Sequence, residues 1–154
     1  MKEGRRLGVG VIGCGHISAA YCRLMPLFGS IALRAVADLD AEAAKMRGAE
    51  AGVPATSPEA LLDDPAIDIV VNLTPPAAHF DVSMAALAAG KHVYSEKPLV
   101  LTSGEGAALK RAADAAGLAV AAAPDTFLGG AHQQARKLVD DGVIGEGISG
   151  TCHI

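Results

Sequence analysis

The chain has 154 residues, 51% of them hydrophobic, which suits one domain with a single buried core. A net charge of -4 without a run of basic residues excludes a surface built for the phosphate backbone of nucleic acid. No apolar stretch approaches the roughly 18 residues that span a bilayer, and three cysteines without a CxxC pair indicate neither a disulfide framework nor a metal site. We therefore expect a soluble, cytoplasmic protein without a nucleic-acid or membrane partner.

Apolar runs and amphipathic stretches alternate along most of the chain. The run at 7–12 predicts a strand, and Ile17, Tyr21, Leu24 and Phe28 then recur at helical spacing. The same patterns predict further strands at 31–37, 67–73, 92–94 and 118–122, and further helices at 41–51, 58–62, 77–89, 103–116 and 131–140. This alternation predicts an α/β fold with a doubly wound parallel sheet, the Rossmann type.

A Gly-rich motif, Gly13-Cys14-Gly15-His16-Ile17-Ser18, lies where the first strand meets the first helix. It matches GxGxxG except that Ser18 replaces the third glycine. Gly13 permits the tight turn, and Gly15 lets the backbone approach a pyrophosphate at the helix N-terminus. Asp38 ends the second strand, where a carboxylate accepts hydrogen bonds from ribose hydroxyls. The combination favours a dinucleotide site over a simple turn, with contacts from Gly13, Gly15, His16, Ile17 and Asp38.

The residues around Asp38 favour NAD over NADP as the cofactor. Its carboxylate repels a 2′-phosphate, and Leu39 and Asp40 follow it in place of an arginine that would receive one. Arg34 and Lys45 are the nearest cations, and the direction of their side chains decides how strong the preference is.

Glu96-Lys97-Pro98 follows the strand at 92–94 and so lies at the carboxyl edge of the sheet, where open α/β sheets bind ligands. The Lys97 ammonium can polarise a substrate oxygen, while Glu96 can bond a ribose or orient the lysine. Taken alone, such a pair is more often a solvated surface pair.

Further motifs occur in a characteristic order: Asn72-Leu73-Thr74-Pro75-Pro76, His79, Ala89-Gly90-Lys91-His92-Val93 and Ser95-Glu96-Lys97-Pro98-Leu99. From about Leu7 onward the chain strongly resembles the Gfo/Idh/MocA oxidoreductases. The resemblance implies an NAD(P)-dependent dehydrogenase of sugars, inositols or related polyols, with Lys97 assisting substrate binding and catalysis. It also implies that the backbone around Leu73, Thr74 and Pro75 lines the cofactor cleft and that Glu96 contacts the nicotinamide ribose. His79 is either a cofactor-site residue or a packed histidine.

The loop at 124–130 resembles the segment near the nicotinamide and substrate in relatives. Asp125, Thr126, His132 and Gln133 are therefore candidate substrate contacts, although an ordinary loop before a helix explains them equally well. Members of the family are much longer, and their C-terminal α/β domain supplies the substrate pocket, which we expect this chain to lack. The alternatives to half of a dehydrogenase are a non-catalytic dinucleotide sensor or interaction module, and a truncated product without independent activity.

The C-terminal tail predicts a last strand, because Ile148, Cys152 and Ile154 fall on one face. An unpaired apolar strand invites association, as in a homo-oligomer. We therefore predict a dinucleotide-binding domain over 1–145, and over 146–154 either an assembly strand or the start of a second domain.

Overall fold

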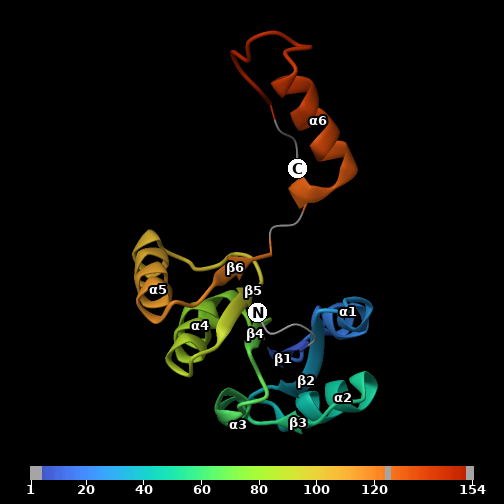
Figure 1. Ribbon diagram of the computed structural model, residues 1–154, viewed down its shortest axis with the longest axis vertical. Coiled ribbons are helices and arrows are strands. Elements are labelled where there is room, and N and C mark those ends of the chain that lie inside the picture. Colours follow the sequence, from blue (N-terminus) through green and yellow to red (C-terminus); the bar gives the residue numbers. More distant parts are fainter. Residues whose placement is uncertain (1–4, 124–125, 152–154) are drawn as a thin grey trace. The chain divides into compact units, whose positions relative to one another are not determined.

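The computed structural model describes residues 5–123 and 126–151. The chain divides into two compact units, Met1–Ala123 and Pro124–Ile154. The first is a sheet covered by helices, and the second contains the 3-10 helix η3 (Thr126–Leu128) and the helix α6 (Gly130–Asp140) (Figure 1). No helix in the described part of the chain is long and apolar enough to cross a membrane.

A six-stranded sheet forms the centre of the first unit, in the order β3-β2-β1-β4-β5-β6 (Figure 1). Every neighbouring pair is parallel. The order reverses between β1 and β4, which creates the switch point where doubly wound sheets bind ligands. The strands are β1 (Leu7–Ile12), β2 (Ile31–Ala37), β3 (Ala55–Thr56), β4 (Ile69–Asn72), β5 (His92–Ser95) and β6 (Val120–Ala122). The predicted Rossmann-type sheet is confirmed.

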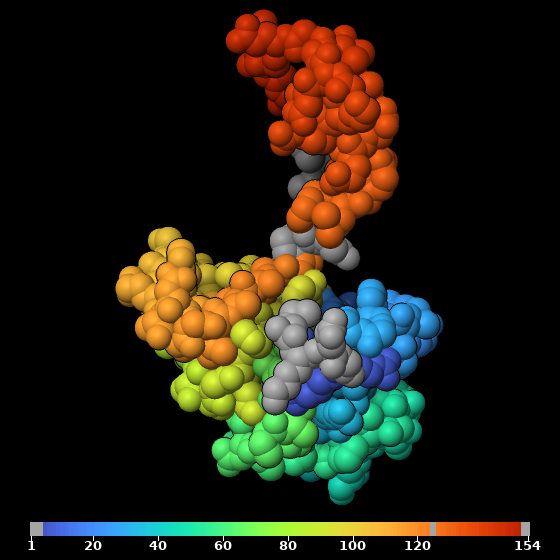
Figure 2. Space-filling view, in the orientation of Figure 1, coloured from blue at the N-terminus to red at the C-terminus, as the bar shows by residue number. Residues whose placement is uncertain are grey.

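Helices cover both faces of this sheet and create two hydrophobic cores. Cys22 of α1 and Ala44 of α2 belong to the core that includes Val36, whereas Leu87 and Leu109 belong to the core on the other face. Figure 2 shows α1 and α2 (blue to blue-green) and α4 and α5 (yellow-green to orange) on opposite sides of this unit. The helices are α1 (Ser18–Leu24), α2 (Ala41–Ala51), α3 (Pro58–Asp63), α4 (His79–Ala88) and α5 (Ser103–Ala116), with 3-10 turns η1 (Met25–Leu27) and η2 (Pro76–Ala78).

Local sequence explains where these helices begin and end. The Asp40 side chain accepts from the backbone N–H groups of Glu42 and Ala43, and Gly52 ends α2 at a φ of 68°. A capping box between Thr102 and Glu105 starts α5. The helix predicted at 41–51 is therefore confirmed with the same bounds.

The first helix buries a different face from the predicted one. Ile17, Leu24 and Phe28 are 43%, 46% and 58% exposed, so the predicted apolar face is wrong. The buried side is formed by Ser18, Cys22 and Met25. The small side chains of Ser18 and Cys22 allow the helix to pack closely on the sheet. Pro26 converts the last turn into a 3-10 helix.

Two further differences concern short segments. The strand β3 has only two residues, too few to show an alternating pattern, and it pairs with Val36 and Ala37 of β2. The predicted tail strand is not found in the described residues 145–151, where no neighbouring strand bonds to the backbone. Cys152 and Ile154 lie outside the described residues.

Candidate cofactor site

The turn after β1 carries the Gly-rich motif at the carboxyl edge of the sheet. Gly13 has a φ of +104°, and a Cβ built on it would lie 2.5 Å from the carbonyl carbon of Leu73. Gly15 differs, because a Cβ there would have no heavy atom of the described residues within 4 Å. Gly13 is thus needed for packing against the segment after β4, and Gly15 borders open space.

Ser18 occupies the position of the third glycine and is completely buried. Its Oγ donates to the carbonyl oxygen of Gly15 at 2.6 Å, and Nη2 of Arg47 donates to the same oxygen at 3.4 Å. These bonds hold the carbonyl of Gly15 toward the two helices that carry Ser18 and Arg47. His16 and Ile17 follow on the exposed side of the turn, where their predicted cofactor contacts stay predictions.

The Asp38 carboxylate directly supports the same turn. Its Oδ2 accepts from the backbone N–H of Cys14 at 2.6 Å, and its Oδ1 accepts from the N–H of Asp40 at 2.9 Å. Both oxygens are therefore oriented from the end of β2. Sequence reasoning predicted the ribose contact of Asp38 and missed its bond to the Gly-rich turn, for which no sequence signal exists.

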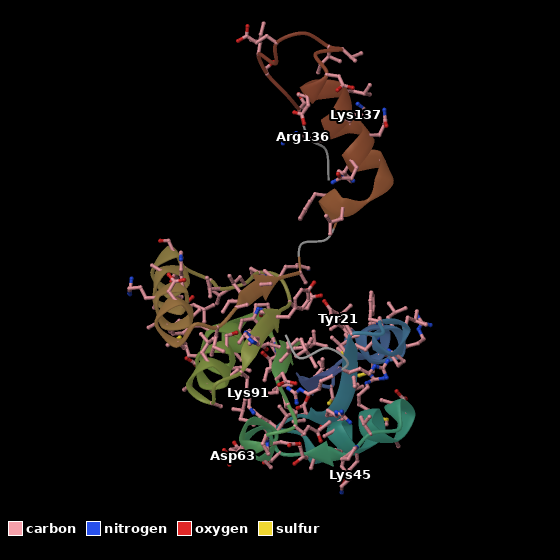
Figure 3. The ribbon with its side chains drawn as sticks, viewed as in Figure 1. Tyr21, Lys45, Asp63, Lys91, Arg136 and Lys137 are labelled. Atoms are coloured by element: carbon pink, nitrogen blue, oxygen red, sulfur yellow. The ribbon has the colours of Figure 1, made fainter. Side chains whose placement is uncertain are left out.

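A pocket of about 340 Å³ lies beside Asp38. Lys45, labelled in Figure 3, is one of the residues that line this pocket, and its Nζ pairs with Glu42 at 2.7 Å. Arg34 lies elsewhere, because its Cγ is 3.3 Å from the Cβ position of Gly8, near the opposite end of β1. The pocket is lined by Asp38, Leu39, Ala41, Ala44, Lys45, Ala55, Thr56, Ser57, Pro58 and Glu59. Of the two cations named from the sequence, only Lys45 lies at the site.

Cys14 is buried within the Gly-rich motif. Burial, reinforced by the negative charge of Asp38, raises the pKa of its thiol from 9.0 to about 11. The unfolded chain therefore loses this proton near pH 9 while the folded chain retains it, so rising pH favours unfolding until about pH 11.

We expect the free energy of unfolding to fall between pH 9 and pH 11, and to fall less in Cys14→Ala. The difference in slope is at most about 1.4 kcal/mol per pH unit. Urea unfolding at stepped pH measures both slopes, and Cys22 is unchanged in both proteins. Equal slopes would contradict the assignment of this effect to Cys14.

The segment after β5 presents the Glu-Lys-Pro sequence. The Tyr21 hydroxyl donates to Oε1 of Glu96 at 2.9 Å, and the backbone N–H of Lys97 donates to Oε2 at 2.8 Å. Tyr21, labelled in Figure 3, thus connects α1 to this segment across the switch point. The Lys97 side chain is exposed at the same edge. Sequence reasoning placed Tyr21 on the apolar face of the first predicted helix and missed this bond.

The segment after β4 completes this edge. Leu73 is buried beside Gly13, while Thr74 and Pro75 are progressively more exposed. His79 begins α4 and is only 1% exposed. The structure therefore brings the segments of the Gly-rich turn, Asp38, 73–75 and Glu96 to one edge of the sheet, as the parallel order requires.

The candidate substrate contacts belong to the second unit. Thr126 lies in η3, and His132 and Gln133 lie in α6, all exposed. Gln133 Nε2 donates to the carbonyl oxygen of Phe127 at 2.7 Å. Asp125 lies outside the described residues. Their contact with a substrate stays a prediction. Among the described residues no group of three His, Cys, Asp or Glu side chains is placed to hold a metal ion.

Known proteins with similar sequences include inositol dehydrogenases. An inositol 2-dehydrogenase/D-chiro-inositol 3-dehydrogenase of Lactiplantibacillus plantarum is 31% identical over 95% of this chain and 43% of its own length. An NADP(+)-dependent scyllo-inositol 2-dehydrogenase of Bacillus subtilis is 37% identical over 56% of this chain and 24% of its own. The chain thus spans less than half the length of these relatives.

Solved structures with bound nicotinamide cofactors superpose closely on this chain. The 3-ketoreductase KijD10 of Actinomadura kijaniata, in complex with NADP, superposes with a TM-score of 0.86 at 29% identity, covering 92% of this chain and 46% of that one. GenD2 from gentamicin A biosynthesis, in complex with NAD, gives a TM-score of 0.85 at 29% identity over 90% of this chain and 40% of that one. Residues 7–123 match the oxidoreductase family with an NAD-binding Rossmann fold. The chain belongs to the Gfo/Idh/MocA oxidoreductase family.

Proposed function

We propose that this chain is the nucleotide-binding half of a dehydrogenase that acts on a polyol or sugar, with NAD preferred over NADP. The observation that carries the proposal is the bond from the Asp38 carboxylate to the Gly-rich turn. This bond joins the Asp38 carboxylate, which would accept hydrogen bonds from the ribose hydroxyls, to the backbone of the turn, which would bind the pyrophosphate.

The residues present fit a dinucleotide. Open space at Gly15 allows close approach of a pyrophosphate, and the pocket beside Asp38 offers room for an adenosine end. The segment 73–75 follows β4, which lies on the other side of β1 from β2 and Asp38, so it would line the nicotinamide end of the cleft. A bound nicotinamide would supply the hydride donor or acceptor of the reaction.

Lys97 is the candidate catalytic residue in this proposal. Its exposed ammonium stands at the carboxyl edge of the sheet, where it would polarise the reacting oxygen of a substrate. The Glu96 carboxylate beside the lysine accepts from the Tyr21 hydroxyl and from the backbone N–H of Lys97, which fix its position. The inositol chemistry of the two relatives supports a polyol or a similar sugar as the substrate class.

The preference for NAD gives a direct test. We expect NADH to bind more tightly than NADPH, and Asp38→Asn to reduce the ratio of the two affinities by about tenfold, since the substitution removes the charge that repels a 2′-phosphate. Asparagine keeps one acceptor oxygen for the N–H of Cys14, which alanine would not. Calorimetric titration of both nucleotides measures the ratio.

Asp63→Asn is the matched control, because it makes the same change of charge at an exposed position of α3 that does not line the pocket (Figure 3). It should leave both affinities within about twofold. Failure of the unsubstituted chain to bind either nucleotide would overturn the proposal. Equal changes in both aspartate variants would overturn the role of Asp38.

A further inference from the structure

A buried polar network lies beneath the carboxyl edge of the sheet, where a Rossmann core is usually apolar. Asn72 is completely buried, and its Nδ2 donates to Ser83 Oγ at 3.1 Å and to the carbonyl oxygen of His79 at 3.0 Å. Its Oδ1 accepts from the Thr74 hydroxyl at 2.6 Å. Such a network is retained where it fixes one arrangement of the groups around it.

The His79 ring connects two segments of the site. Its Nδ1 lies 2.6 Å from the carbonyl oxygen of Pro98, and its Nε2 lies 2.8 Å from the carbonyl oxygen of Thr74. Pro98 directly follows Lys97, and Thr74 belongs to the segment that packs on Gly13. Each ring nitrogen therefore faces a backbone acceptor on a different loop. The ring donates to both carbonyl oxygens when each nitrogen carries a proton, whereas a neutral ring donates to one of them.

We propose that His79 is a positioning residue, whose imidazole ties the segment carrying Lys97 to the segment after β4. Besides this tie, the bonds of Glu96 hold the described residues after β5 near the edge of the sheet: its backbone N–H donates to the carbonyl oxygen of Asn72 at 2.9 Å, and its carboxylate accepts from Tyr21 and Lys97. The role in catalysis rests on the proposed function, whereas the tie itself can be tested without a cofactor.

The two sides of the ring can be tested separately. An asparagine amide takes about the place of Nδ1 and can keep the bond to Pro98, while a glutamine amide takes about the place of Nε2 and can keep the bond to Thr74. Phenylalanine fills a similar volume without a donor. The three variants of His79 therefore separate the Pro98 bond, the Thr74 bond and simple packing.

Amide hydrogen exchange in the cofactor-free protein measures the tie at the amides of Lys97 and Leu99, with Val70 and Val93 as buried strand references. We expect the exchange rates of the Lys97 and Leu99 amides to rise about tenfold in His79→Gln and His79→Phe and to change much less in His79→Asn. A parallel titration with NADH should show weaker binding in the same two variants.

Three outcomes would overturn the proposal. Exchange could stay unchanged in all variants, rise equally in His79→Asn and His79→Gln, or rise as much at Val70 and Val93 as at Lys97, which would show a purely global effect on stability. If the exchange pattern appears but the unsubstituted chain binds no NADH, the tie stands and only the proposed function fails.

Discussion

Gly13→Ala should lower the free energy of unfolding by about 3 kcal/mol or more. The new Cβ would lie 2.5 Å from the carbonyl carbon of Leu73 and 2.7 Å from the backbone N of Thr74. Backbone atoms cannot rotate away as a side chain would, and a φ of +104° is unfavourable for alanine. Urea unfolding followed by circular dichroism measures the loss.

Gly15→Ala is the matched substitution, and we expect the opposite pattern. No heavy atom of the described residues lies within 4 Å of its Cβ position, so the free energy of unfolding should change by less than about 0.5 kcal/mol. The methyl group would instead occupy space needed by a pyrophosphate, and we expect the dissociation constant for NADH to rise about 10- to 100-fold. Wild-type affinity in Gly15→Ala would place the pyrophosphate elsewhere.

Most of the fold could be predicted because hydrophobic runs separated by amphipathic stretches specify a parallel α/β sheet. Strands such as β1 are buried on both faces and form continuous apolar runs. The face of α1 could not be predicted in this way, because Ser18 and Cys22 contact the sheet through small size rather than strong hydrophobicity. Strand β3 was missed because two residues carry no period.

The candidate site was predictable where chemistry depends on residue type at the ends of strands, as for Gly13 and Asp38. It was not predictable where the effect depends on a contact distant in sequence. Tyr21 reaches Glu96, and His79 reaches Pro98, only because β1, β4 and β5 are neighbours in the sheet. The spacing of these residues along the chain says nothing about either bond.

Lys91→Met should lower the free energy of unfolding by about 2–4 kcal/mol, although Lys91 belongs to a motif that the resemblance linked to function. The side chain lies away from the cofactor edge (Figure 3), and the residue is only 7% exposed. Its Nζ donates to the carbonyl oxygen of Asp64 at 2.7 Å and to that of Ile67 at 2.9 Å. Methionine fills most of the volume but leaves the buried carbonyl groups without this donor.

Lys110→Met is the control, because Lys110 lies on the exposed side of α5 and pairs with Asp114 at 2.6 Å. An exposed pair of this kind contributes about 0.5 kcal/mol or less, so this variant should unfold close to the unsubstituted protein. Urea unfolding at low and high salt separates the two lysines further, since added salt screens the surface pair and leaves the buried bonds of Lys91 nearly unchanged. Equal losses of stability in both variants would show that Lys91 acts as an ordinary surface charge.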